Sequence, residues 1–199
     1  MIGRYSVAVL AATSALLAAA VAARGGAAGQ DDTHARSVAA FTVMDRVLTS
    51  PRCQNCHTLT QFPRQGDDRH PHRLNVVRGA NGHGATAMAC MTCHGRANNA
   101  ASGVPGADED WHLAPLSMGW EGFSPALRCA HLKDPTHNGG RNGAAIITHL
   151  GTNLVTWAWR PGNDAHGRPR TPPPVDYAAF KAAAATWVAT GAACPVAVR

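Results

Sequence analysis

The chain contains the pentapeptide C-x-x-C-H twice, as Cys53-Gln54-Asn55-Cys56-His57 and as Cys90-Met91-Thr92-Cys93-His94. This spacing is the attachment signature of c-type haem. Two thiols three positions apart can each form a thioether with a haem vinyl group, and the adjacent histidine is placed to give one axial nitrogen to the iron. Two copies predict two c-type haems. The residues assigned to them are the thioether cysteines Cys53, Cys56, Cys90 and Cys93 and the proximal ligands His57 and His94.

Two C-x-x-C pairs are also compatible with a four-thiolate zinc site or with disulfides. A zinc site would leave His57 and His94 without a role, and chance rarely places a histidine directly after both pairs when the chain has 11 His in 199 residues. An export signal, described below, also disfavours a cytosolic zinc ribbon. The haem interpretation is therefore preferred.

The ligand on the opposite face of each iron sets its potential and reactivity. A second histidine gives a low-potential six-coordinate carrier, a methionine raises the potential, and an open site favours catalysis or gas binding. Three candidates stand out: His72 in the loop between the motifs, Met118 in a loop after a proline, and His149 on an expected helix. The alternative role for His149 is that of a hydrogen-bonded core histidine. The sequence leaves open which candidate pairs with which haem.

Residues 1–22 have the pattern of a secretory signal peptide, with Arg4 before an apolar run from Val7 to Val21. Ala20-Val21-Ala22 offers a cleavage site, and cleavage as late as about residue 28 is compatible with the sequence. An uncleaved membrane anchor is the alternative, but an apolar run of about 15 residues is shorter than the ~20 that a spanning helix needs. We therefore expect export to the periplasm of a Gram-negative bacterium, with no transmembrane segment after cleavage.

Hydrophobic spacing predicts a mainly α chain: a compact cytochrome c-like domain with long loops around two covalently bound haems, over residues 37–199, after a flexible linker over 23–36. Four helices are expected, at residues 37–49, 124–132, 141–150 and 176–190. The segments 58–87 and 97–122 lack periodicity, and 161–174 is a loop rich in Pro, Gly and Arg. No strand alternation is convincing anywhere in the chain.

Cys129 and Cys194 lie outside both motifs. In an exported protein, a remaining pair of cysteines is most simply a disulfide. Free reactive thiols are the alternative.

The chain has a formal net charge of +6 and a pI of about 9.4. The excess is small and scattered, and haem propionates would offset much of it, so we expect no nucleic-acid partner. Arg64, Arg69, Arg73 and Arg78 follow the first motif, and arginine often pairs with propionates through its bidentate fork. An ordinary solvated loop is an equal alternative for these four residues.

Several runs of residues are similar to those of small exported bacterial di-haem proteins labelled as an isoquinoline 1-oxidoreductase-type subunit. The resemblance covers about residues 38–195. It implies electron acceptance from a periplasmic molybdenum hydroxylase. Molybdopterin and iron–sulfur signatures are lacking in this chain, so the resemblance implies the electron-transfer partner rather than the catalytic subunit. The runs are Phe62–His72, Trp111–Pro115, Met118–Gly122, Lys133–Pro135 and Asn138–Arg141.

The sequence thus leads to the expectation of a carrier of single electrons rather than an enzyme. Its partners would be a donor dehydrogenase, for which a molybdenum hydroxylase is one candidate, and a downstream cytochrome or oxidase of the respiratory chain. Two alternatives keep one iron open: a small di-haem oxidase or peroxidase, and a haem-based gas sensor. A high-spin ferric spectrum would favour the former, and carbon monoxide binding the latter.

Overall fold

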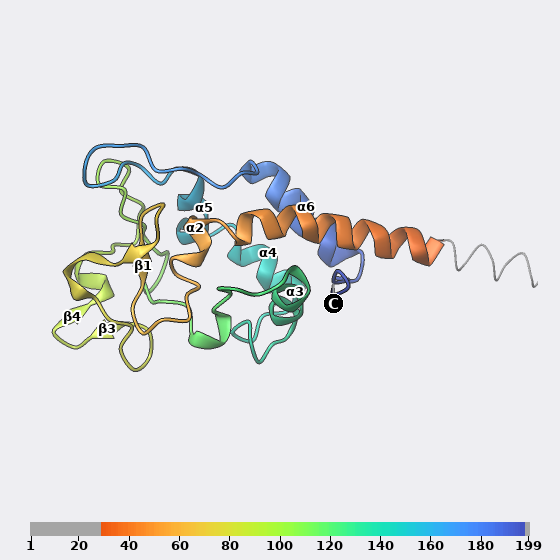
Figure 1. Ribbon diagram of the computed structural model, residues 1–199, viewed down its shortest axis with the longest axis horizontal. Coiled ribbons are helices and arrows are strands. Elements are labelled where there is room, and N and C mark those ends of the chain that lie inside the picture. The colour runs from red at the N-terminus through yellow and green to blue at the C-terminus, as the bar shows by residue number, and fades with distance from the viewer. Residues whose placement is uncertain (1–28, 198–199) are drawn as a thin grey trace, which may run out of the picture.

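The computed structural model describes residues 29–197. The expected signal peptide, with its cleavage sites, lies outside the described residues. The described chain is mainly helical with little sheet, as expected, and its helices gather at one end while long loops form the other (Figure 1).

A long N-terminal helix occupies residues 29–48 of the described chain. Phe41, Met44, Val47 and Leu48 lie on its buried face at three- and four-residue steps, which confirms the helix expected from residue 37. Residues 30–36, expected as part of a flexible linker, are helical as well. The chain has no Gly or Pro between residues 30 and 50, so nothing local stops the helix from extending beyond the core.

Three further helices were expected, and each begins at a residue that caps it. The helices are α3 (Pro125–Lys133), α4 (Gly143–His149) and α6 (Tyr177–Ala189). The side chains of Ser124, Asn142 and Asp176 each accept a hydrogen bond from a backbone N–H of the first turn, as N-cap residues do.

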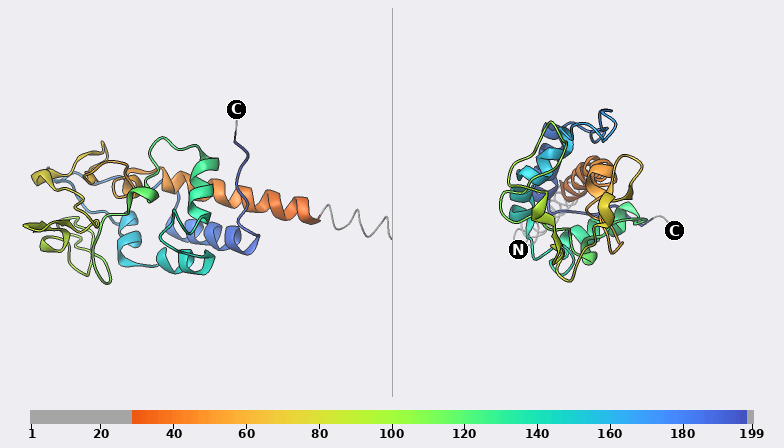
Figure 2. Two further views of the ribbon diagram at one scale, coloured as in Figure 1. Left: turned by 90° about the horizontal axis from the view of Figure 1, so that it is seen from below. Right: turned by 90° about the vertical axis from the view of Figure 1, so that its left-hand side faces the viewer.

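The helices pack into one hydrophobic core at the N-terminal helix (Figure 2). Helix α6 buries Phe180, Ala184 and Trp187, and the ring of Trp187 lies 5.8 Å from that of Phe41, centre to centre. Helix α4 contacts α6. The loops extend from this core.

The rest of the described chain contains only short helices and strands, and none of them was expected from the sequence. Helix α2 and helix α5 each span a single turn, and the strands form two antiparallel hairpins of two-residue strands. Their bounds are α2 (Pro51–Gln54), β1 (Arg64–Gln65), β2 (His70–Pro71), η1 (Arg73–Asn75), β3 (Gly84–Ala85), β4 (Met88–Ala89), η2 (Cys90–Thr92), η3 (Leu116–Met118), α5 (Asn153–Thr156) and η4 (Trp157–Trp159).

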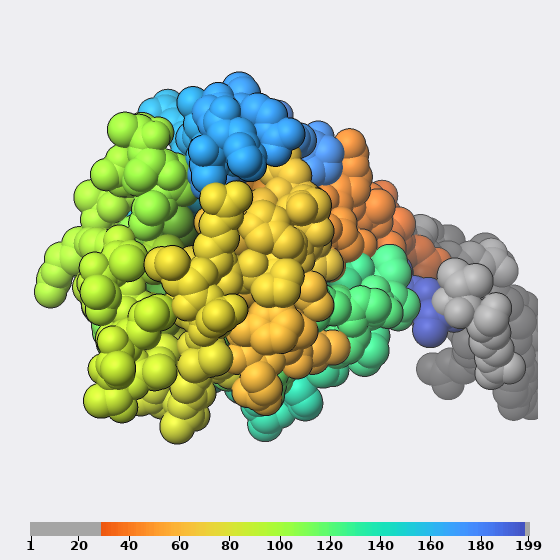
Figure 3. Space-filling view, turned by 60° about the vertical axis from the view of Figure 1, so that its left-hand side comes forward, coloured from red at the N-terminus to blue at the C-terminus, as the bar shows by residue number. Residues whose placement is uncertain are grey.

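The loop over residues 161–174 lies across the loop end of the molecule, beside segments from the first half of the chain (Figure 3). Thr171 donates two hydrogen bonds to Asp67, from its N–H at 3.0 Å and its hydroxyl at 2.8 Å. The guanidinium of Arg170 donates to the carbonyls of Gly103 and Pro161. Polar contacts thus fix this loop where regular secondary structure is sparse.

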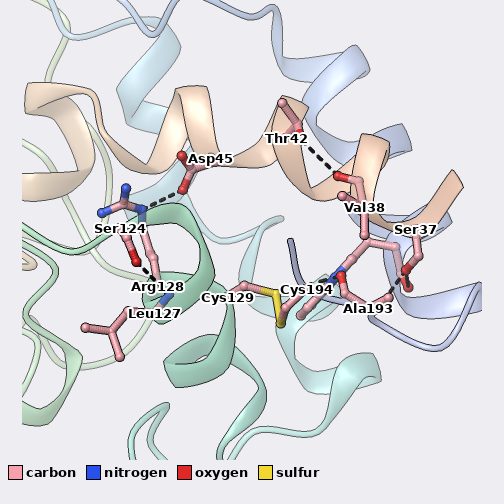
Figure 4. Close-up of a disulfide and its surroundings, with 11 residues drawn as sticks. Ser37, Val38, Thr42, Asp45, Ser124, Leu127, Arg128, Cys129, Ala193 and Cys194 are labelled. Atoms are coloured by element: carbon pink, nitrogen blue, oxygen red, sulfur yellow. Dashed lines mark hydrogen bonds and ion pairs between the residues drawn. A yellow bond between two sulfur atoms is a disulfide. The ribbon is translucent and has the colours of Figure 1, made fainter. Parts of the chain in front are cut away.

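Cys129 of α3 and Cys194 form a disulfide, as expected, with their Cα atoms 5.6 Å apart (Figure 4). The tail that carries Cys194 is also held by the N-terminal helix, because the Ala193 N–H donates to the Ser37 hydroxyl at 2.8 Å. Arg128 Nε lies 2.6 Å from Asp45 Oδ1 and ties α3 to the same helix.

No helix among residues 29–197 is both long enough and apolar enough to cross a membrane.

The disulfide yields a stability prediction. The double variant Cys129→Ser/Cys194→Ser should lower the free energy of unfolding by about 4 kcal/mol, because the bond closes a loop of 65 residues and restricts the unfolded chain. Urea denaturation followed by circular dichroism measures the change. Reduced wild-type protein should reproduce it, and equal stabilities of variant and oxidised wild type would contradict the prediction.

Candidate functional site

The first C-x-x-C-H motif borders a cavity that we call the first cavity. Cys53 lies in α2, which starts at Pro51 directly after the N-terminal helix, and Cys56 and His57 follow in the next turn. His149, at the end of α4, lines the same cavity. The cavity has a volume of about 100 Å³ and is partly open to solvent. Its apolar walls include Met44, Leu48, Leu132, Ile146, Leu150 and Phe180.

The imidazole of His57 is fixed by two contacts. Its Nδ1 donates a hydrogen bond to the carbonyl of Met118 at 2.9 Å, and its ring stacks on Trp120 at 3.8 Å with only 5° between the planes. With the proton on Nδ1, the Nε2 lone pair is left as the acceptor. Burial lowers the pKa of His57 to about 4, so the ring is neutral.

The second motif borders a second cavity, with a volume of about 290 Å³, and repeats this arrangement. Cys90 and Cys93 lie in and directly after η2, and His94 follows. His94 Nδ1 donates to the carbonyl of Pro105 at 2.8 Å, and its ring stacks on Trp111 at 4.0 Å. A histidine anchored by a backbone carbonyl and backed by a tryptophan thus occurs at both motifs.

His72 lines the second cavity opposite His94. The two ring centres are 6.3 Å apart, and His72 Nδ1 donates to the Arg73 carbonyl at 2.8 Å, which leaves its Nε2 as the acceptor. Two imidazoles that bind one metal ion from opposite sides, with metal–nitrogen distances of about 2.0–2.1 Å, have ring centres roughly 6 Å apart. The distance between the ring centres of His72 and His94 therefore matches that of two imidazoles bound to one metal ion.

The other candidate ligands lie at the first cavity. Burial, followed by the charge of Arg141, lowers the pKa of His149 to about 4, so this imidazole is neutral and competent as a ligand. Met118 also lines the first cavity, but from the His57 side, because its own carbonyl accepts the bond from His57.

The two cavities adjoin each other. Cys90, Ala107 and Trp111 form a small buried cluster, and Cys56 and Leu154 pack against it. One cysteine from each C-x-x-C-H motif therefore contributes to the packing at this cluster, which brings the two motifs together.

The four motif cysteines are unpaired. Burial raises the pKa of Cys53 to about 11 and that of Cys56 to about 12, so both are neutral thiols. Within residues 29–197, no group of three or more His, Cys, Asp or Glu side chains is arranged to hold a metal ion directly.

The four arginines that follow the first motif have protein partners or lie at the surface. Arg64 and Arg69 pair with Glu121, and the buried Arg78 donates to backbone carbonyls, among them that of Ala114. Arg73 is exposed. Two arginines that the sequence analysis did not single out line the first cavity instead, Arg52 and Arg141. The position of Arg52 directly before Cys53 was the one sequence feature that could have indicated its place beside the first motif.

Glu121 lies within the run Met118–Gly122 but was not singled out as a functional or structural residue from the sequence. Its carboxylate accepts hydrogen bonds from the Thr58 hydroxyl at 2.9 Å and the Leu59 N–H at 2.8 Å, and it pairs with Arg64 and Arg69. Burial alone would raise the pKa of Glu121, but these hydrogen bonds and cations outweigh it and the pKa is lowered. The carboxylate thus fixes the segment directly after His57.

Comparison of the chain with protein-family models, with curated proteins and with solved structures gave no match. Functional conclusions therefore depend on the chain's own residues and their geometry.

Glu121→Gln should lower the free energy of unfolding at neutral pH by about 1–3 kcal/mol, because charge-assisted hydrogen bonds become neutral ones. The lowered pKa stabilises the fold above the ordinary glutamate pKa of 4.5, and this stabilisation is lost as pH falls below it. The difference between wild type and variant should therefore shrink in acid.

Chemical denaturation at neutral and acidic pH measures both effects. Glu109→Gln, at an exposed position, is the matched control and should behave as wild type. A difference between wild type and Glu121→Gln that does not depend on pH would contradict this account of Glu121.

Proposed function

We propose that the chain is a periplasmic di-haem c-type cytochrome that carries single electrons between a donor dehydrogenase and a downstream cytochrome or oxidase. The observation that carries the proposal is the repeated unit: a C-x-x-C-H motif whose histidine donates Nδ1–H to a carbonyl, stacks on tryptophan and leaves Nε2 to bind iron. The resemblance to exported di-haem subunits suggests a molybdenum hydroxylase as the donor.

Haem would supply a reversible one-electron Fe(III)/Fe(II) couple, and the protein would set its environment. The carbonyls of Met118 and Pro105 fix the tautomer of the two proximal histidines and increase their basicity as ligands. The stacked rings of Trp120 and Trp111 restrict rotation of the imidazoles. Apolar side chains form much of the wall of the first cavity and would lower the polarity around the iron.

The surface around the second cavity supports a large apolar group there. Leu74, Val77 and Met88 line this cavity, yet their exposed fractions are 72%, 45% and 40%. Large apolar side chains that gather at one cavity mark a site where an apolar partner binds. A haem held at Cys90 and Cys93 would cover them.

We prefer a pair of histidines as the ligands of each iron. His72 faces His94 across the second cavity, and His149 shares the first cavity with His57. Met118 is disfavoured on the far face of the first haem, because its backbone lies at Nδ1 of His57, on the side of the ring away from the iron. If His72 and His149 hold the two irons together with His94 and His57, no ligand position would be open, which would favour a carrier over a peroxidase or gas sensor.

The contact between the motifs supports transfer of electrons between the two haems. Cys56 and Cys90 pack in the same apolar cluster with Trp111 and Leu154, so the two points of attachment are neighbours. Electrons that enter at one haem can then leave from the other within one small protein.

The axial ligands give a direct test. Wild-type protein matured with haem should carry two haems per chain by mass, show low-spin spectra in both redox states and bind no carbon monoxide. His72→Ala should open one haem to carbon monoxide, His149→Ala the other, and the double variant both.

Two control variants sharpen this experiment. His166→Ala, at an exposed position, and Met118→Leu should leave both haems low-spin. Protein without covalent haem would overturn the proposed function, and carbon monoxide binding by wild type would favour the gas-sensor alternative.

A further inference from the structure

Two neighbouring side chains on the wall of the first cavity carry N–H groups without an acceptor. Arg52 and Trp157 both line this cavity, and the Cζ atom of Arg52 lies 5.7 Å from the centre of the Trp157 ring. Arg52 Nε and Trp157 Nε1 are both buried and have no hydrogen-bond partner in the structure. The motifs and the candidate axial ligands leave these two donors unexplained.

Arg52 is held in place by contacts outside the cavity. Its side chain is 1% exposed, and its Nη2 lies 2.5 Å from Asp67 Oδ1. Asp67 is in turn fixed by two hydrogen bonds from Thr171. A buried guanidinium normally has several hydrogen-bond acceptors, because N–H donors of a charged group are costly to leave without partners. Among residues 29–197, however, Asp67 is the only hydrogen-bond acceptor of Arg52.

Two adjacent unmet donors, one of them cationic, match the chemistry of a carboxylate. A carboxylate has two acceptor oxygens and binds arginine through charge-assisted hydrogen bonds, and an indole N–H can donate to the same group. A haem attached at Cys53 and Cys56 brings carboxylates into this cavity as its propionates.

We propose that Arg52 and Trp157 together bind a propionate of the haem held by the first motif, and that this contact raises the reduction potential of that haem. The inference rests on the proposed function. A cation beside the haem favours the reduced iron, which carries one positive charge fewer. Asp67 and Thr171 then act as positioning residues for Arg52, so the 161–174 loop indirectly supports the cofactor.

Spectroelectrochemical titration of the di-haem protein tests the inference. Arg52→Gln and Trp157→Phe should each shift one of the two reduction steps to lower potential and leave the other step unchanged. Arg52→Lys, which keeps the charge, should restore most of the potential. Trp157→Phe keeps the ring and removes only the N–H, so it remains informative should Arg52→Gln fail to fold.

Arg160→Gln is the matched control, because it removes a positive charge from an exposed residue close to Trp157 in the chain. It should leave both steps at wild-type potential. Variants that carry two haems with both steps unchanged, or with both steps shifted equally, would overturn the inference while the proposed function stands. Wild-type protein without covalent haem would overturn both.

Discussion

The hydrogen bond from Nδ1 of a motif histidine to a backbone carbonyl is the interaction on which both candidate sites depend. It occurs at His57 with Met118 and at His94 with Pro105, and each imidazole is also backed by a tryptophan ring. The bond fixes the tautomer, so the nitrogen that faces the cavity is the one with a free lone pair. Much of the surrounding structure serves to place those two carbonyls and two indole rings.

Regular secondary structure provides only part of that placement. The first motif follows directly after the N-terminal helix, and His149 lies at the end of α4. Helix α6 and the Cys129–Cys194 disulfide complete the packing of the helices. Between the two motifs the strands are two residues long. There, buried polar side chains replace the hydrogen bonds of a sheet. Arg78 donates to the carbonyls of Thr58, Thr60 and Ala114, and Glu121 anchors the segment after His57. Such networks stabilise a loop only when all their members are in place.

The two cavities lie close together. Cys56 and Cys90 contribute to one apolar cluster, and Pro105, whose carbonyl anchors His94, also lines the first cavity. The two sites thus share structural parts. This closeness suits a protein proposed to pass electrons between the two sites.

Local signals in the sequence predicted the helices. Ser124, Asn142 and Asp176 cap helices with their own side chains, and apolar spacing marked the buried faces, so α3, α4, α6 and the helix before Pro51 were all foreseen. Residues 30–36, expected as part of a flexible linker over 23–36, are helical, and a polar helix that projects from the core has no apolar stripe to reveal it. The hairpins were not predicted, because strands of two residues are too short to show an alternation of apolar and polar residues.

The sequence by itself determined the two motifs, the helical frame and the cysteine pair left for a disulfide, because each is encoded by residues near one another in the chain or by simple count. Only the tertiary structure decided which residues meet across the cavities. It placed His72 opposite His94 and His149 in the cavity of His57, assigned Arg64 and Arg69 to Glu121, and brought Arg52 beside Trp157. These contacts join residues far apart in sequence through irregular loops, whose paths depend on packing and buried polar bonds rather than on any local repeat.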